Sequence, residues 1–311
     1  MSFLVDIILP VFGTLGLGYV AARCKLFDEA ANRGLSLFVF NFAIPLMLFL
    51  AIAQTDLPER MPWGYMLSYY IGAVTVFGGG MLVARFIGRR ALDAQGVSGL
   101  GASFSNTAML GIPLVIMAYG EAAALPLFIL LTCHSLVLLP PATIFVEAHR
   151  GSQQSFARML GHILQGIATT PIIWGLAAGL LFALAGWKVP GPVESIARGL
   201  GGAAVPCALF ALGASLVRYR IVGQLAEPLA LVALKTLVHP VLVWLLATRV
   251  FDVPADWVPV AVTLAALPAG ITPYLFAQRY QVCQPQIATT VFVSTVFSVV
   301  SLSLLLFVMR G

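Results

Sequence analysis

The sequence predicts an all-α integral membrane protein in which ten transmembrane helices form two inverted repeats of five helices each. Composition is the first reason, because 60% of the 311 residues are apolar and only 9% are charged. The mean hydropathy of +0.98 is far above that of soluble domains. The second reason is a series of ten apolar stretches, each about 20 residues long, the length that crosses a bilayer as a helix. The third is an internal repeat.

The repeat is visible in the spacing of the prolines. Three prolines of the first half recur in the second half at offsets of 160 or 161 residues: Pro10 as Pro171, Pro45 as Pro206, and Pro113 as Pro273. The segment AIPLMLFLAIAQ around Pro45 also matches AVPCALFALGAS around Pro206 in chemical type. A chain built from two copies of a membrane half-domain is typical of secondary transporters.

The ten predicted helices are defined by continuous apolar runs. A strand of a membrane barrel would instead alternate in polarity over about ten residues, so helices are predicted throughout. In chain order they lie near residues 3–22, 34–53, 63–84, 97–118, 122–146, 166–186, 195–217, 228–250, 257–278 and 286–309.

The distribution of Lys and Arg predicts the orientation, because these residues are enriched in cytoplasmic loops. Eleven of them follow helices 1, 3, 5, 7 and 9, and five lie on the opposite side. Both termini are therefore expected outside the cell, in a bacterial inner membrane. Because each repeat has an odd number of helices, the second copy enters the membrane from the opposite side and is therefore inverted. The predicted domains are the first repeat at 1–147, a cytoplasmic linker without chemistry of its own at 148–165, and the second repeat at 166–311.

Several functions are disfavoured by what the sequence lacks. The cations are spread over loops, so there is no basic patch for nucleic acid. The cysteines Cys24, Cys133, Cys207 and Cys283 are scattered without CxxC spacing, which argues against a metal site or a disulfide framework. No nucleotide-binding motif indicates ATP-driven transport, and no cofactor is expected. The chain is not expected to be an enzyme, since no nucleophile with a neighbouring base occurs near the helix breaks.

The substrate site is expected where two helices are interrupted. Pro113 follows the polar stretch SFSNTAMLGIP, and Pro268 and Pro273 bracket PAGITP in the equivalent helix of the second half. Proline removes a backbone donor and clashes with the preceding turn, and glycine loosens the helix further. Interrupted backbone in a membrane must line protein or a wet cavity, and the N-termini of the half-helices would attract an anion.

Three segments resemble the auxin efflux carrier family, which includes plant auxin exporters and bacterial carriers of organic acids such as malonate. They are SNTAMLGIPLVIMAYGE, AALPAGITPYLFAQRYQVCQPQIATTV and NRGLSLFVFNFAIPLMLF. The resemblance implies that helices 4 and 9 break at proline and cross. It also implies an elevator-type movement of transport helices 3–5 and 8–10 against scaffold helices 1, 2, 6 and 7, and a homodimer through the scaffold.

The same resemblance nominates residues for the carboxylate substrate. In the family, the Asn of the NTxxxGIP motif contacts the substrate, which corresponds to Asn106, and the crossing prolines correspond to Pro113 and Pro273. The polar residue of the fifth helix corresponds to His134. The candidate substrate-binding residues are Asn41, Ile44, Asn106, Thr107, Pro113, His134, Gly270, Ile271 and Pro273. The alternatives are that Asn41 and Asn106 satisfy backbone groups freed by the breaks, and that His134 is a packing residue.

Lys235 and His239 are candidates for coupling transport to an ion. They are four residues apart on helix 8 and share one face, and an ionisable residue within a membrane span suggests a function because placing it there costs free energy. The alternative is that the Lys235 side chain snorkels to the inner surface.

The predicted function is transport of a small organic anion, driven by an ion gradient or by the membrane potential. Leu48 replaces a small polar residue of the plant members, and helix 3 lacks their Asp, so a small acid such as malonate is favoured over auxin. The expected partners are this carboxylate and the lipid bilayer. A sodium-coupled symporter of the bile-acid type is the alternative, and a membrane enzyme is the alternative from another class.

Overall fold

The computed structural model describes residues 2–55, 57, 63–150, 161, 165–166, 168–218 and 224–310. Within these ranges the chain is helical and contains no β-strand beyond one isolated bridge, which confirms the all-α prediction. Most of the predicted linker at 148–165 lies outside the described residues. Helix is present in each of the ten predicted stretches, while the inverted relation of the two halves stays a prediction.

Six of the described helical stretches are long and apolar enough to cross a membrane. They are Glu29–Ala53, Trp63–Phe86, Glu121–His149, Gly191–Leu216, Ala226–Arg249 and Gln284–Met309. Shorter apolar helices cover Ile8–Arg23, Thr107–Tyr119 and Pro171–Ala185. The chain is therefore an integral membrane protein by composition and by the length of its helices.

The chain forms two compact units, and each unit draws segments from both halves of the sequence. Unit 1 comprises Met1–Met61, Ile112–Phe128 and Leu164–Arg218, and unit 2 comprises Pro62–Gly111, Ile129–Ile163 and Tyr219–Gly311. The helices of unit 1 are α1 (Ser2–Arg23), α2 (Glu29–Phe38), α3 (Ile44–Ala53), α6 (Ile112–Tyr119), α9 (Pro171–Ala185), α10 (Gly191–Gly201) and α11 (Ala204–Leu216).

Unit 2 holds most of α7 (Ala124–His149), whose first residues belong to unit 1. Its other helices are α4 (Trp63–Phe86), α5 (Leu92–Ser103), α12 (Ala226–Ala233), α13 (His239–Arg249), α14 (Val258–Ala266), α15 (Ile271–Tyr280) and α16 (Gln284–Arg310).

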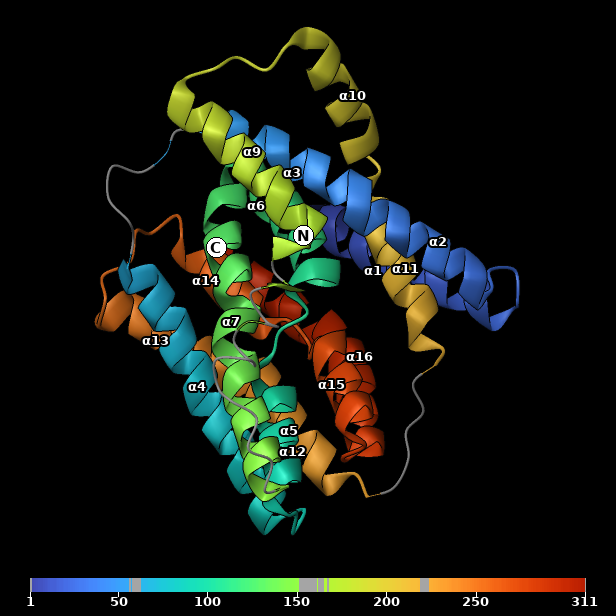
Figure 1. Cartoon of the computed structure of the whole chain (residues 1–311), viewed down its shortest axis with the longest axis vertical. Helices are drawn as coiled ribbons and strands as arrows, with labels where there is room; N and C mark the ends of the chain where they lie inside the picture. Colours follow the sequence, from blue (N-terminus) through green and yellow to red (C-terminus); the bar gives the residue numbers. More distant parts are fainter. Residues whose placement is uncertain are drawn as a thin grey trace. The chain divides into compact units, whose positions relative to one another are not determined.

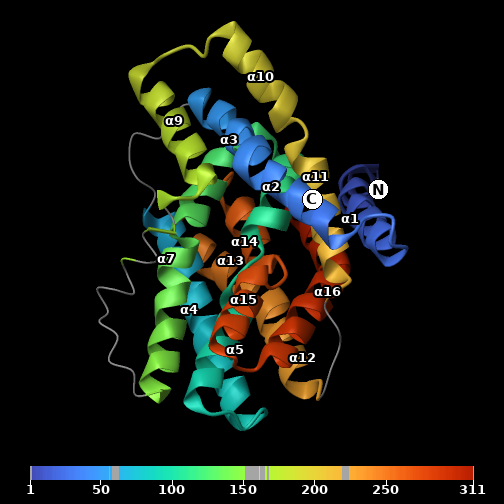
Figure 2. The same ribbon diagram turned by 45° about the vertical axis from the view of Figure 1, so that its right-hand side comes forward.

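Glycines let the helices of unit 1 approach closely. A Cβ atom at Gly213 of α11 would lie 1.8 Å from the carbonyl oxygen of Leu15 in α1, and one at Gly18 of α1 would lie 2.1 Å from that of Phe210. A second pair of neighbouring helices in this unit is α3 and α9, which lie side by side in Figures 1 and 2. Because backbones meet where a side chain is missing, the packing of α1 on α11 depends on these two glycines.

We expect Gly213→Ala to destabilise the protein, because the added methyl group meets backbone that cannot rotate away. Overpacking of this kind costs about 1–3 kcal/mol. The matched control is Gly13→Ala in α1, where a Cβ atom would meet nothing within 4 Å, so its unfolding midpoint should stay the same or rise. Thermal unfolding in detergent compares the two variants, and equal midpoints would contradict the role of Gly213.

Three short π-helical turns each end two residues before a proline. The turn Val39–Ala43 precedes Pro45, the turn Thr107–Gly111 precedes Pro113, and the turn Leu234–Val238 precedes Pro240. Proline cannot donate the hydrogen bond to the carbonyl four residues earlier, and the wider π-helical turn accommodates the missing bond. Such turns frequently mark functional sites. The predicted residues Asn41, Thr107 and Lys235 lie in these turns.

Unit 2 contains two helix interruptions that pair with each other. α5 ends at Ser103 and helical structure resumes at Thr107, while α14 ends at Ala266 and α15 begins at Ile271. The extended residues between them form an antiparallel bridge that joins Ser105 to Ala269. Both breaks were predicted from the sequence, but the first one falls before the π-helical turn rather than at Pro113 itself.

Candidate functional site

The candidate site is the pair of broken helices in unit 2. The backbone N–H of Asn106 donates to the carbonyl of Pro268 at 2.9 Å, and the N–H of Gly270 donates to the carbonyl of Phe104 at 2.9 Å. These two bonds satisfy backbone groups that the interruption removes from the helices, as buried polar groups require. The pairing fixes the start of the π-helical turn at Thr107 and the start of α15.

Side chains of neighbouring helices support the first break. The N–H of Ser105 donates to Nε2 of His134 in α7 at 3.1 Å, and the hydroxyl of Tyr69 in α4 lies 3.1 Å from the hydroxyl of Ser105. All three residues are buried. Because Nε2 of His134 accepts a hydrogen bond, the neutral imidazole carries its proton on Nδ1. That nitrogen is buried and has no partner among the described residues.

The second break is supported by α16. The N–H of Ala269 donates to the hydroxyl of Ser294 at 3.1 Å, and this hydroxyl donates to the carbonyl of Val291 at 3.1 Å. Ser294 belongs to a buried row at four-residue spacing with Thr290 and Ser298. Helix α16 thus presents a polar stripe inside an apolar helix, and the stripe holds the interruption.

Polar groups remain available at the breaks. Asn106 is 6% exposed and Thr107 is 4% exposed, yet within the described part of the chain neither side chain makes a hydrogen bond. Helix α15 begins without a side-chain cap, so the first N–H groups of Ile271 and Thr272 have no helical acceptor. Free amide and hydroxyl donors together with a helix N-terminus suit an anionic group.

The structure brings together only some of the predicted site residues. Asn106, Thr107, His134, Gly270 and Ile271 lie at the paired breaks, and Pro273 is buried in the first turn of α15. Asn41, Ile44 and Pro113 belong to unit 1. Asn41 is half-buried in its π-helical turn, and Ile44 and Pro113 are buried.

Lys235 and His239 form a buried pair on one face, as their spacing predicts. Both residues are 0% exposed, and the Lys235 Nζ atom lies 3.3 Å from Nδ1 of His239. The Lys235 amino group also donates to the carbonyl of Ala265 in α14 at 2.5 Å. The alternative that Lys235 snorkels to the surface does not hold, because its amino group ends inside unit 2.

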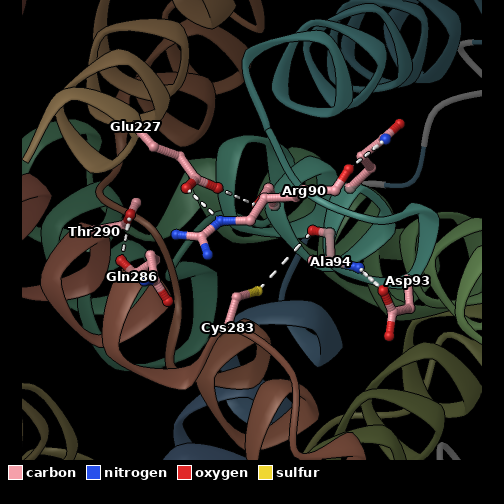
Figure 3. A network of polar contacts seen from close by, with 9 residues as sticks. Arg90, Asp93, Ala94, Glu227, Cys283, Gln286 and Thr290 are labelled. Carbon is pink, nitrogen blue, oxygen red and sulfur yellow. Dashed lines mark hydrogen bonds and ion pairs between the residues drawn. The ribbon is translucent and has the colours of Figure 1, made fainter. Parts of the chain in front are cut away.

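A second polar network lies where α4, α5, α12 and α16 approach one another (Figure 3). Nε of Arg90 donates to Oε2 of Glu227 at 2.9 Å, and the hydroxyl of Ser98 donates to Oε1 at 3.0 Å. In the orientation that gives both ends of its amide a partner, the Gln286 side-chain oxygen accepts a hydrogen bond from Nη2 of Arg90 at 2.8 Å. A Cβ atom at Gly88 would lie 2.5 Å from Oε2 of Glu227, so this glycine makes room for the buried carboxylate.

The network reaches Cys283 in the turn before α16. Its thiol lies 4.0 Å from the carbonyl of Ala94 (Figure 3). Burial, and secondarily the negative charge of Glu227, raises the pKa of the Cys283 thiol to about 12. The nucleophilic thiolate is therefore scarce at neutral pH.

We expect Cys283 to react slowly with a water-soluble maleimide at pH 7.5 and faster as the pH rises toward about 12. Exposed Cys24 is the internal control and should label readily at pH 7.5. Mass spectrometry of the labelled peptides measures both sites in one sample. Equal labelling of the two thiols at neutral pH would contradict the raised pKa of the Cys283 thiol.

The residues that hold the breaks in place were not predicted from the sequence. Tyr69, Ser105 and Ser294 were not among the predicted site residues. The four-residue spacing of hydroxyl side chains along 290–298 was the available signal. Tyr69 gave no comparable signal, because one aromatic residue in a membrane helix is ordinarily a packing residue.

An all-helical chain with several helices of membrane-spanning character and a pair of interrupted helices has features typical of secondary transporters. The profile of the family described as "Membrane transport protein" matches residues 3–306. The chain belongs to this family, the auxin efflux carrier family that its motifs resemble.

Two relatives illustrate the range of the family. A Rhizobium meliloti (strain 1021) protein named "Putative malonate transporter" is 28% identical over 311 residues, which cover 100% of this chain and 97% of the relative. "Auxin efflux carrier component 8" of Arabidopsis thaliana is 24% identical over 334 residues, covering 90% of each chain. The similarity in both cases extends over nearly the whole length.

Proposed function

We propose that this transporter carries a small organic anion and binds its carboxylate at the paired helix breaks. The observation that carries the proposal is that Asn106, which is 6% exposed beside the break, has a side-chain amide with no hydrogen-bond partner among the described residues. An amide N–H₂ donates two hydrogen bonds, and hydrogen bonds to a charged acceptor are the stronger ones. The uncapped N-terminus of α15 adds further donors in the same unit.

The proposed substrate is a small dicarboxylate or monocarboxylate such as malonate. The name of the Rhizobium meliloti relative supports this class, as does the difference from the plant pattern. Leu48 is buried where plant members tend to have a small polar residue, and α4 contains no Asp. Any charge selectivity would therefore depend on amide and hydroxyl donors rather than on a carboxylate in α4.

The proposed mechanism is elevator-type alternating access, in which unit 2 carries the substrate and unit 1 stays in place. The division of the chain supports it, because both paired breaks and their supporting helices belong to unit 2, while α1, α2, α3, α9, α10 and α11 belong to unit 1. Helix α6, the second part of the predicted transport helix 4, also belongs to unit 1. The proposed location is a bacterial inner membrane with both termini outside, which the distribution of Lys and Arg supports.

Reconstitution into proteoliposomes tests the proposal. Radiolabelled malonate, other short carboxylates and indole-3-acetate are supplied with and without a pH gradient, a sodium gradient or a membrane potential. We expect saturable uptake of at least one short carboxylate that exceeds uptake into empty liposomes. Radiolabel detects electroneutral exchange as well as net charge movement. If the whole panel gives no flux with correctly folded protein, the proposed substrate class is wrong.

A further inference from the structure

Lys235 occupies an unusual position for a lysine. Its π-helical turn lies in the middle of the membrane-length stretch Ala226–Arg249, and the side chain is 0% exposed. No carboxylate oxygen of the described residues lies within 4.0 Å of its amino group. Charged residues are almost never fully buried unless they are paired. The partners that Lys235 does have must therefore account for its place in the fold.

These partners are acceptors of the kind that a cation requires. The carbonyl of Ala265, 2.5 Å from Nζ, belongs to the last turn of α14, which ends at Ala266. The final carbonyls of a helix have no helical N–H partner and carry the negative end of the helix dipole. When Lys235 is protonated, its ammonium group has donors and no acceptor, so Nδ1 of His239 at 3.3 Å serves as its second acceptor. Its imidazole is then neutral, with the proton on Nε2.

The lysine is connected to both helix breaks. Through Ala265 it contacts the end of α14 directly before the second break. Through His239 it reaches Tyr69, because the two rings lie 5.4 Å apart, and the Tyr69 hydroxyl lies 3.1 Å from that of Ser105 in the first break. A substitution of Lys235 is therefore expected to affect both helix breaks.

We propose that Lys235 keeps its proton and that its ammonium group is a built-in cation, which holds the end of half-helix α14 and takes the place of a coupling metal ion. In secondary transporters with interrupted helices, unwound backbone carbonyls and half-helix C-termini coordinate the coupling cation. Here the ammonium group binds such a carbonyl. A sodium ion on the same carbonyl would lie a few ångströms from Nζ, and like charges at that distance repel strongly in a low-dielectric interior.

Two consequences follow. The folded protein does not need sodium, and the anion transport proposed above proceeds without a sodium gradient. The second consequence rests on the proposed function, whereas the first does not. Removing the ammonium group leaves the end of α14 without its cation, and a small metal cation then regains access to the vacated carbonyl.

The experiment compares the wild type, Lys235→Met and Lys188→Met. Methionine keeps much of the length of the lysine stem and removes the charge, and Lys188 is an exposed lysine of unit 1 that serves as the matched control. Thermal unfolding of each purified protein is measured in sodium chloride and in choline chloride at equal ionic strength. This readout needs no substrate. Carboxylate uptake into proteoliposomes is then measured in the same two salts.

We expect the wild type and Lys188→Met to unfold at the same temperature in both salts. Lys235→Met should unfold at least about 5 °C lower in choline and recover part of this loss in sodium. Its carboxylate uptake in choline should be at least about tenfold slower, the effect of losing one charge-assisted hydrogen bond. Wild-type stability that rises with sodium, or an Lys235→Met midpoint equal to the wild type in both salts, would overturn the proposal.

The remaining outcomes are also decisive. If the wild type transports none of the carboxylates but the unfolding data come out as expected, the substrate class is wrong and the built-in cation stands. If Lys235→Met does not fold, the measurements on the wild type in the two salts test the proposal by themselves. Radioactive sodium that enters together with the carboxylate would refute the proposal, and carboxylate uptake without sodium entry would support it.

Discussion

Asn106→Ala is expected to weaken the apparent affinity for the transported carboxylate strongly while leaving the protein folded. The side-chain amide of Asn106 makes no hydrogen bond within the described part of the chain, so its removal costs the fold little, and the backbone N–H that donates to Pro268 is retained. A hydrogen bond to a charged group contributes about 1.5–3 kcal/mol, so the apparent affinity should fall by roughly 10- to 150-fold. Initial rates of radiolabelled uptake against substrate concentration measure this change.

Two further variants make this result specific. Asn106→Asp has nearly the same shape, but its negative charge repels an anion, so its transport should be at least as poor as that of Asn106→Ala. Ser103→Ala is the matched control, since the Ser103 hydroxyl is buried in α5 and donates to the carbonyl of Gly99 within its own helix. Its transport should resemble the wild type. Normal transport by Asn106→Asp would exclude direct contact between this side chain and the anion.

Arg90→Ala is expected to cause the largest loss of stability. The Glu227 side chain is only 4% exposed and pairs with Arg90 at 2.9 Å. Removing the guanidinium group leaves a buried carboxylate whose one side-chain hydrogen-bond partner among the described residues is Ser98. Breaking a buried ion pair from one side costs about 3–5 kcal/mol, because the remaining charge is uncompensated. The unfolding midpoint of the purified protein measures this loss.

A double-mutant comparison separates the unpaired charge from lost packing. Glu227→Gln in the Arg90→Ala background removes the buried charge and should recover a large part of the stability. Arg33→Ala is the matched control, because Arg33 and its partner Glu29 are 74% and 63% exposed, and such pairs contribute less than about 1 kcal/mol. If the double variant is less stable than Arg90→Ala, the unpaired carboxylate is not the cause.

The fold class and the location of the breaks could be predicted because they depend on local composition. Apolar runs of membrane length predicted the helices, and the prolines and glycines of PAGITP predicted the interruption at 267–270. The first break was placed less well. The tertiary bond between Asn106 and Pro268 stabilises extended backbone at 104–106, whereas Pro113 is accommodated by a π-helical turn.

The supporting residues and the partner of Lys235 could not be predicted, because they depend on contacts between segments distant in sequence. Tyr69 and Ser105 are 36 residues apart, and Lys235 and Ala265 are 30 apart. The spacing of Lys235 and His239 showed a shared helix face but not what that face meets. Snorkelling and burial were therefore both consistent with the sequence, and only the packing of α14 against this turn distinguishes them.

Equilibrium binding can show whether a carboxylate binds at the paired helix breaks through Asn106. Isothermal titration of malonate into the purified wild type and into Asn106→Ala, both checked for equal unfolding midpoints, separates binding from movement across the membrane. We expect saturable binding to the wild type and binding to Asn106→Ala that is at least about tenfold weaker. Equally tight binding to both proteins would contradict this expectation and would place the substrate elsewhere in the transporter.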